Sequence, residues 1–188
     1  MIKRSIYTFK EMIRYRKQIT NVKHGSCIDS VVQLTTTYLH DKGIKYLALD
    51  FDGVLASHGK SEPLPEVLAW LDNFSKDFGQ DNIFILSNKP TQERLDFFAA
   101  KYPKIRFIAG VAKKPYPDGM LKIIDIVKCD ANELALVDDR LLTGCLACII
   151  ADCHPMLITK PYVDKINYDL KERFFSFLRF LEQMLFFK

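Results

Sequence analysis

Short apolar runs alternate with longer amphipathic segments between residues 45 and 151, and this alternation restricts the fold more than any other feature. The runs are rich in Leu, Ile, Val and Phe without regular polar alternation, which is typical of strands buried on both faces of a parallel sheet. Strands are predicted over residues 45–49, 82–86, 105–109, 133–137 and 146–151. Helices are predicted over residues 65–78, 91–102 and 117–128, with a short helical turn at 141–145. We therefore expect an α/β fold: a three-layer, doubly wound, Rossmann-like domain with a central parallel sheet of about five strands.

The chain of 188 residues divides into three parts by composition. Residues 1–24 form a basic amphipathic segment, and residues 25–163 form the predicted α/β domain, which begins with a helix expected over residues 29–40. Residues 164–188 predict a Phe-rich helix packed on that domain. No internal repeat or low-complexity linker separates these parts, so one globular domain with two terminal helices is expected.

Polar side chains follow four of the predicted strands at the point where each strand ends. In chain order they are Asp50 with Asp52, Ser87 with Asn88, Lys113 with Lys114, and Asp138 with Asp139. In a doubly wound sheet, ligands bind beyond the carboxyl ends of the strands. Two acid pairs, a hydroxyl and cations would therefore meet at one edge, which is the composition of a metal and phosphate site.

This composition suits phosphoryl transfer, which needs a nucleophile in line with the leaving group and positive charge around the equatorial oxygens. A carboxylate can be the nucleophile and forms an aspartyl phosphate. Because aspartate and phosphate repel each other, a divalent cation is expected between them, and hard oxygen ligands select Mg²⁺. Asp50 and Asp139 are the natural pair for Mg²⁺, whereas Asp52 can stand clear of it. Gly53 would let the backbone turn tightly there.

Four short motifs resemble those of the haloacid dehalogenase superfamily of aspartate-nucleophile phosphatases. They are DFDGVL at 50–55, ILSNK at 85–89, KKP at 113–115 and LVDDR at 136–140. The resemblance implies that Asp50 is the nucleophile and Asp52 the general acid and then base. It also implies that Ser87 and Lys114 hold the phosphoryl group and that Asp139 is a Mg²⁺ ligand.

Further ligands follow from the same resemblance. The backbone carbonyl of Asp52 would coordinate Mg²⁺, and Asp138 would be a second acidic partner of the metal. The substrate-binding residues expected at the strand ends and in the loop after the first motif are Gly53, His58, Ser87, Asn88 and Lys114.

The short spacing between the motifs leaves no room for a cap domain. About 34 residues separate Asp52 from Ser87, and about 26 separate Ser87 from Lys114. Members of the superfamily choose substrates largely through cap insertions, so a capless member implies an open site. An open site favours a phosphate displayed on something large, such as a membrane lipid, a protein or a nucleic acid end.

A narrower likeness extends over much of the chain, from the helix before the first strand to the segment VDDRLLTGCLACII. It is similar to the phosphatidylglycerophosphate phosphatase branch of the superfamily. Two departures stand out. Gly53 follows Asp52 where that branch usually has Asn, and Gly144 stands where it usually has a second Asp, so Asp138 is expected to serve the metal instead.

Three functions are compatible with these motifs. The first is a Mg²⁺-dependent phosphomonoester hydrolase that acts on a membrane lipid phosphate such as phosphatidylglycerophosphate. The second is a phosphoprotein phosphatase, for example on phosphotyrosine. The third is a non-catalytic, membrane-associated interaction module, although the complete set of site residues argues against it.

The two terminal segments carry the remaining partner predictions. Residues 1–24 contain seven Lys and Arg and one Glu, which gives this segment a net charge of +6, whereas the whole chain carries +4. The apolar residues of the segment recur at helical spacing. This helix would lie on an anionic membrane surface or dock on the domain.

The C-terminal segment has one apolar stripe at helical spacing, formed by Leu170, Phe174, Phe177, Leu181, Met184 and Leu185. Three further Phe residues lie off this stripe: Phe175, Phe180 and Phe187. The surplus Phe residues indicate a second contact with a membrane, the N-terminal helix or a second subunit, as in a homodimer. No nucleic acid partner is expected.

Cysteine usage and hydropathy indicate the cellular compartment of the protein. Five cysteines at irregular spacing, without a signal-peptide core, predict a reducing compartment, here the cytoplasm, with peripheral membrane attachment left open. Cys145, Cys148 and Cys153 could be half of a zinc site, but a second half with suitable spacing is missing, so small buried hydrophobes are favoured.

Overall fold

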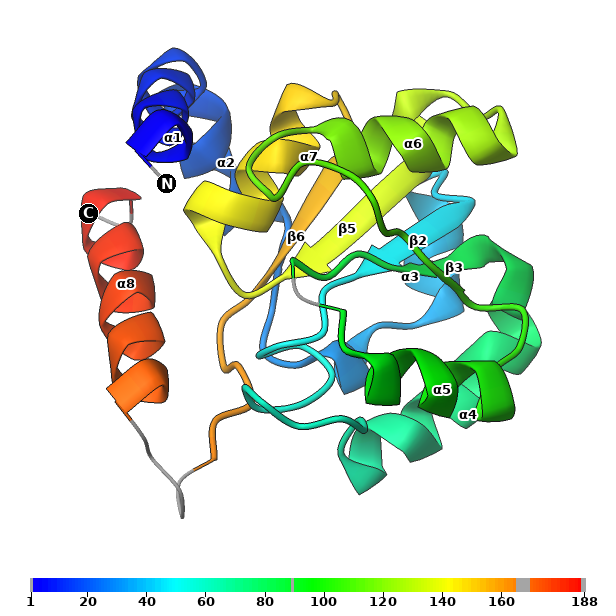
Figure 1. The fold of residues 1–188 in the computed structure, drawn as a ribbon. Coiled ribbons are helices and arrows are strands. Elements are labelled where there is room, and N and C mark those ends of the chain that lie inside the picture. The colour runs from blue at the N-terminus through cyan, green and yellow to red at the C-terminus, as the bar shows by residue number, and fades with distance from the viewer. Residues whose placement is uncertain (1, 89, 165–169, 187–188) are drawn as a thin grey trace.

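The computed structural model describes residues 2–88, 90–164 and 170–186; within these ranges, the side chains of residues 23, 24, 170 and 171 are not described. Six parallel strands form one sheet in the order β1-β6-β5-β2-β3-β4 (Figure 1). The strands are β1 (Cys27–Ile28), β2 (Tyr46–Leu49), β3 (Ile83–Ile85), β4 (Arg106–Phe107), β5 (Leu134–Asp138) and β6 (His154–Ile158). The α/β class and the parallel sheet are confirmed, with one strand more than expected.

Helices cover both faces of this sheet, as Figure 1 shows. The α-helices are α1 (Ile2–Arg14), α2 (Arg16–Gly25), α3 (Thr36–Asp41), α4 (Pro65–Phe78), α5 (Gln92–Lys101), α6 (Asp118–Val127), α7 (Leu146–Ile150) and α8 (Leu170–Phe186). Short turns of helix are η1 (Val31–Gln33), η2 (Gln80–Asn82), η3 (Ala131–Glu133) and η4 (Leu141–Cys145). None of the described helices is both long enough and apolar enough to cross a bilayer.

Alternate residues of the central strands point to opposite faces and build two separate cores. Leu47 and Leu49 of β2 pack in one cluster with residues of α4 and α5, whereas Ala48 between them packs in a second cluster with residues of α6. Every residue of β5 is buried. Burial on both faces explains why these strands have no polar alternation in the sequence.

The strand predicted over residues 146–151 is wrong, because Leu146–Ile150 forms helix α7. Cys148 of this helix packs against the sheet, while Leu146 and Ile149 pack in a third cluster that includes Ile19 of α2. A short apolar run buried on all sides has no periodicity that separates strand from helix. The sixth strand, β6, begins only after the turn at Asp152, where φ is +56°.

The helix predicted over residues 29–40 is also partly wrong. The segment forms η1, an extended link at Leu34 and Thr35, and then the short helix α3. Thr35 is the N-cap of α3 and its side chain accepts a hydrogen bond from Tyr38 N. Because this cap begins a new helix at residue 36, the two helical pieces do not join.

The order of the strands determines where the site lies on the sheet. Strands β2 and β5 are neighbours in register, with Leu49 opposite Val137, and Asp50 N donates to Val137 O over 2.9 Å. The chain leaves β2 toward β3 and β4 on one side, and β5 and β6 lie on the other side. The strand order therefore reverses between β2 and β5, and doubly wound proteins bind ligands beyond the strand ends at such a point.

A hydrogen bond between α4 and the end of α5 gives a test of the packing on one face of the sheet. The Tyr102 hydroxyl donates to Asp72 Oδ1 over 2.6 Å, and Tyr102 is buried. We expect Tyr102→Phe to lower the free energy of unfolding by about 1.5 to 3 kcal/mol, the usual contribution of a hydrogen bond to a charged acceptor. Urea unfolding measures this change. Tyr38→Phe is the control, because the half-buried Tyr38 makes no hydroxyl hydrogen bond within the described residues; equal losses in the two variants would contradict the prediction.

Candidate functional site

Three carboxylates meet beyond the ends of β2 and β5. Asp50 follows β2, Asp138 ends β5 and Asp139 comes next, and one carboxylate oxygen of each lies within 4.8 Å of the others. Asp138 and Asp139 are buried. Asp138 Oδ1 accepts a hydrogen bond from Arg140 N over 2.9 Å, which fixes its side chain. The structure thus brings together the three acids that the sequence predicts as metal ligands.

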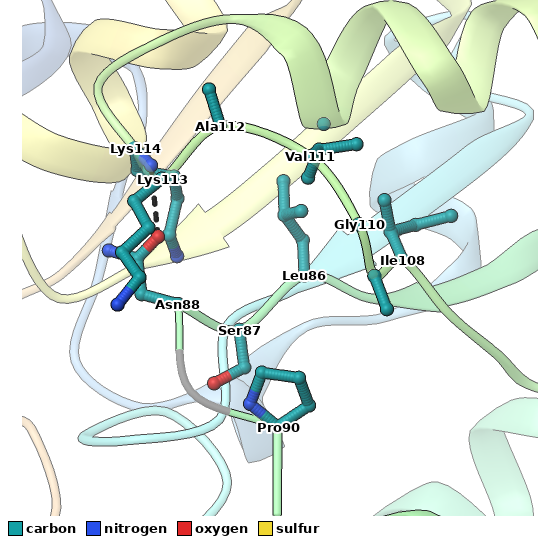
Figure 2. Close-up of a pocket in the computed structure, with 12 residues that line it drawn as sticks. Leu86, Ser87, Asn88, Pro90, Ile108, Gly110, Val111, Ala112, Lys113 and Lys114 are labelled. Carbon is teal, nitrogen blue, oxygen red and sulfur yellow. Dashed lines mark hydrogen bonds between the residues drawn. The ribbon is translucent and has the colours of Figure 1, made fainter.

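Lys114 places a buried ammonium group among these acids. Its Nζ lies 3.0 Å from Asp50 Oδ1 and 2.5 Å from Asp138 Oδ2. The loop that carries it follows β4 and is held by a hydrogen bond from Lys114 N to Asn88 Oδ1 of 2.9 Å, shown as the dashed line in Figure 2. The second and third predicted motifs are therefore joined directly at the site.

Burial dominates the electrostatics of Asp50 and Asp139. Burial, with a further contribution from Asp138, raises the pKa of Asp50 from 3.8 to about 8, although Lys114 opposes the rise. Burial and Asp138 likewise raise the pKa of Asp139 to about 7 against the effect of Arg179. Burial lowers the pKa of Lys114, but Asp138 and Asp50 more than offset burial, so the net change is upward. Ionisation of Asp50 and Asp139 is therefore unfavourable in this buried cluster, and a further cation would stabilise their ionised forms.

The chemistry of these donors fits Mg²⁺. Carboxylate oxygens are the hard ligands that Mg²⁺ prefers, and a site with one or two carboxylates plus substrate phosphate is usual for this ion. Asp50, Asp138 and Asp139 are the side chains that would hold it. No other group of three or more His, Cys, Asp or Glu side chains suited to a metal is found among the described residues.

Two glycines allow the acids to pack this closely. Gly53 has a φ of +83°, and a Cβ at this position would lie 2.5 Å from Asp139 Oδ2. A Cβ on Gly144 would lie 1.9 Å from Asp138 Oδ2. Any side chain at either position would collide with a buried carboxylate group. These contacts give a physical reason for glycine at both positions of this chain.

The carboxylate of Asp52 pairs with the guanidinium of Arg94. Arg94 of α5 donates two hydrogen bonds to this carboxylate, over 2.6 Å to Oδ1 and 3.2 Å to Oδ2. The Arg94 side chain is buried; its Nε donates to Lys60 O and its guanidinium lies 3.8 Å from the centre of the Phe51 ring. Sequence reasoning missed Arg94, because a single arginine in an amphipathic helix carries no local signal of a bidentate contact.

Helix α8 supplies further groups that sequence reasoning missed. Arg179 Nη1 donates to Asp139 Oδ2 over 2.6 Å, and its Nη2 donates to Glu172 Oε1 over 2.9 Å. Glu182 forms an ion pair with Arg140, the residue after the acid pair. Glu172, Arg179 and Glu182 are all buried, and we call them the α8 polar face. Their spacing of seven and three residues places them on one side of a helix, which is the signal that could have revealed them.

His58 lies against α8. Its Nδ1 is 3.0 Å from Glu172 Oε2, and its ring stacks on Phe175 with 4.3 Å between centroids. Burial lowers the pKa of His58, and Asp52 and Glu172 oppose this effect. His58 was predicted to bind substrate; the structure gives it a clear contact with the helix, and its contact with substrate stays a prediction.

A pocket of about 200 Å³ adjoins the acids. Its polar wall consists of Ser87, Asn88, Lys113 and Lys114, and its apolar wall includes Leu86 and Ile108 (Figure 2). This pocket can therefore accept an anionic group together with a small uncharged part of a ligand.

Comparisons with known proteins agree with this geometry. A solved crystal structure aligns with 77% of this chain and 83% of its own, with a TM-score of 0.54 at 11% sequence identity, which supports the fold alone. A search of curated proteins found no match. The family model described as mitochondrial PGP phosphatase matches residues 5–161, which include all four motifs. The chain therefore belongs to the mitochondrial PGP phosphatase family.

Proposed function

We propose that this protein hydrolyses the phosphomonoester of a membrane lipid, with phosphatidylglycerophosphate as the leading substrate, by a Mg²⁺-dependent aspartyl-phosphate mechanism. The family to which it belongs makes it a phosphatase, a phosphoric monoester hydrolase. The observation that carries the mechanism is the contact between Asp50 and the buried Lys114 within the carboxylate cluster. Membership of the PGP phosphatase family supports the lipid substrate.

The first step is attack by a carboxylate oxygen of Asp50 on phosphorus. A bond forms between this oxygen and phosphorus, and the bond from phosphorus to the lipid oxygen breaks. Asp52 donates a proton to the departing oxygen, so the lipid leaves as an alcohol. Arg94 holds the Asp52 carboxylate in one orientation by its two hydrogen bonds.

The second step returns the enzyme to its starting state. Asp52 accepts a proton from water, whose oxygen attacks phosphorus, and the bond between phosphorus and Asp50 breaks to release inorganic phosphate. Lys114 and Ser87 hold the phosphoryl oxygens in both steps, and the Lys114 charge offsets their negative charge. Mg²⁺, when bound by Asp50, Asp138, Asp139 and the carbonyl of Asp52, lowers the repulsion between phosphate and carboxylate.

The surroundings of the site support a large substrate. Between Asp52 and Ser87 the chain forms only loops, α4, η2 and β3, and we propose that no cap domain is present. In this proposal the pocket beside Ser87 and Lys114 holds the glycerol next to the phosphate. A cytoplasmic location stays a prediction, and the family is described as mitochondrial.

A substrate panel tests the proposal against its two alternatives. Turnover is measured on phosphatidylglycerophosphate in mixed micelles, on phosphotyrosine peptides and on an aryl phosphate, each with and without Mg²⁺. We expect Mg²⁺-dependent turnover with the highest kcat/KM on the lipid. A preference for the peptides would favour a phosphoprotein phosphatase, and no turnover of any substrate would favour a non-catalytic module.

Asp50→Asn tests the nucleophile. An amide cannot form the phosphoryl intermediate, so turnover should fall more than about 10³-fold, as expected when a nucleophile is removed. Asp77→Asn is the matched control, because Asp77 is an exposed acid of α4 and lies outside the four motifs. Thermal melting should show both variants folded. Activity of Asp50→Asn at the wild-type level would refute the aspartyl-phosphate mechanism.

The raised pKa values of Asp50 and Asp139 predict how Mg²⁺ stabilises the protein. The folded state, with a pKa of about 8 for Asp50, holds protons that the unfolded chain releases near 3.8, so stability without metal falls as pH rises between these values. Because Mg²⁺ needs ionised carboxylates, its stabilising effect should grow over the same range. At about 100 times its dissociation constant, Mg²⁺ should add about 2.7 kcal/mol.

Thermal melting with and without Mg²⁺, at one pH near 6 and one near 8, measures this effect. The increase in melting temperature caused by Mg²⁺ should be larger at the higher pH. In Asp50→Asn this pH dependence should shrink, because the group with the highest pKa is absent. An equal increase at both pH values in the wild-type protein would contradict the assignment of these acids to the metal.

A further inference from the structure

Helix α8 turns its apolar side away from the protein. Its buried side is the α8 polar face, whereas Phe174, Phe177 and Leu185 are 57%, 55% and 60% exposed. The predicted apolar stripe therefore does not pack on the domain. Leu170, at one end of the stripe, and Phe187, which was predicted to lie off it, are outside the described side chains. A helix on a globular domain usually buries its apolar side, so a solvent-exposed row of this kind marks a contact surface.

Helix α1 exposes a second apolar row. Ile2, Ile6, Phe9 and Ile13 recur at helical spacing and are between 59% and 77% exposed. The opposite side of α1 contacts the protein, where Tyr7 stacks on Tyr116. The stripe predicted for this helix is therefore present, but it faces outward.

The two rows belong to neighbouring helices. Phe186 of α8 and Ile19 of α2 are buried in one cluster, against which Met12 of α1 packs. Both α1 and α8 also contact η4. Figure 1 shows α1 and α8 on the same side of the molecule. We call their outward rows together the α1/α8 apolar surface.

We propose that the α1/α8 apolar surface docks on an anionic lipid bilayer and that α8 thereby holds the active site next to the membrane. This inference rests on the proposed lipid substrate and names the surface that brings the enzyme to it. Amphipathic helices bind bilayers when an apolar row lies beside basic residues. Lys3, Lys10 and Arg14 of α1 are exposed and supply the basic residues.

Charge favours a bilayer over a second copy of the chain as the occupant. The N-terminal 24 residues carry a net charge of +6, so a symmetric dimer through this surface would bring two such segments together. An anionic bilayer instead attracts each basic residue near its surface. The same residues that oppose dimerisation thus favour the lipid surface.

The α8 polar face connects this surface to the chemistry. On the side opposite its apolar row, α8 contacts His58, Asp139 and Arg140 through Glu172, Arg179 and Glu182. A helix with its side chains is about 10 to 12 Å across, so a bilayer on the outer side of α8 would lie about that far from Asp139. Arg179 is the positioning residue of this arrangement, because it ties α8 directly to a predicted metal ligand.

Vesicle flotation tests the docking surface without depending on activity. The full chain is mixed with vesicles of phosphatidylcholine alone or with phosphatidylserine, which is neither the proposed substrate nor its product. Wild-type protein should float with the anionic vesicles. The double variant Phe177→Asp with Leu181→Asp should bind them about tenfold or more weakly, since each apolar side chain contributes to burial in the bilayer. Leu121→Asp with Ile126→Asp, at exposed positions of α6, adds the same charge as a control and should bind as wild type.

Activity on a soluble aryl phosphate separates this inference from the proposed function. The α8 double variant should keep wild-type turnover of the aryl phosphate and lose turnover of lipid in vesicles. Unaltered flotation of this variant would overturn the docking surface even if the enzyme were active. Wild-type flotation without any turnover would leave docking supported and refute the proposed function.

Tryptophan fluorescence gives a second measurement. Phe177→Trp in a Trp70→Phe background should show a blue shift on addition of anionic vesicles and quenching by brominated lipid, whereas Leu121→Trp in the same background should show neither. Sedimentation equilibrium completes the test. A wild-type dimer that becomes a monomer in the α8 double variant, with no vesicle binding in either, would assign the surface to a second copy and refute the proposal.

Discussion

The ion contacts of Lys114 with Asp50 and Asp138 are the interactions on which the rest of the site depends. Three acids lie within 4.8 Å of one another at the ends of β2 and β5, and burying them without a cation would be very unfavourable. Lys114 compensates part of this charge from a loop that Asn88 holds by a hydrogen bond to its backbone. The loops after β3 and β4 are thus linked to each other by Asn88 and to the acids of the central strands by Lys114. Burial still raises the pKa of Asp50 to about 8, so a divalent ion that stabilises the ionised carboxylates suits the site.

Parallel strand topology made much of this site predictable from the sequence. Strands β2, β3 and β5 were predicted because their apolar runs are continuous and end in polar residues, and the carboxyl ends of parallel strands share one edge. This reasoning correctly brought Asp50, Asp138, Asp139 and Lys114 together. It failed for residues 146–151, where an apolar run buried on all sides fits a helix as well as a strand.

Long-range contacts of single side chains were not predictable in the same way. Arg94 contacts Asp52 across 42 positions of the sequence, and Arg179 contacts Asp139 across 40. Each arginine lies in an amphipathic helix, where a basic residue is ordinarily a solvated surface charge. The spacing of Glu172, Arg179 and Glu182 could have indicated a polar side of α8, but only the tertiary placement of α5 and α8 against the strand ends reveals which acids the two arginines contact.

The orientation of α8 follows from a competition between two kinds of burial. Turning its apolar row inward would bury Phe174, Phe177 and Leu185, each worth about 1.5 to 3 kcal/mol. The same rotation would remove Arg179 from Asp139 and Glu182 from Arg140, and breaking a buried pair typically costs about 3 to 5 kcal/mol because an uncompensated charge remains. Since the surface that α8 covers is charged, the polar side of the helix fits it better. The apolar row then faces away from the domain, and the proposed docking of α8 on a membrane would give it a partner.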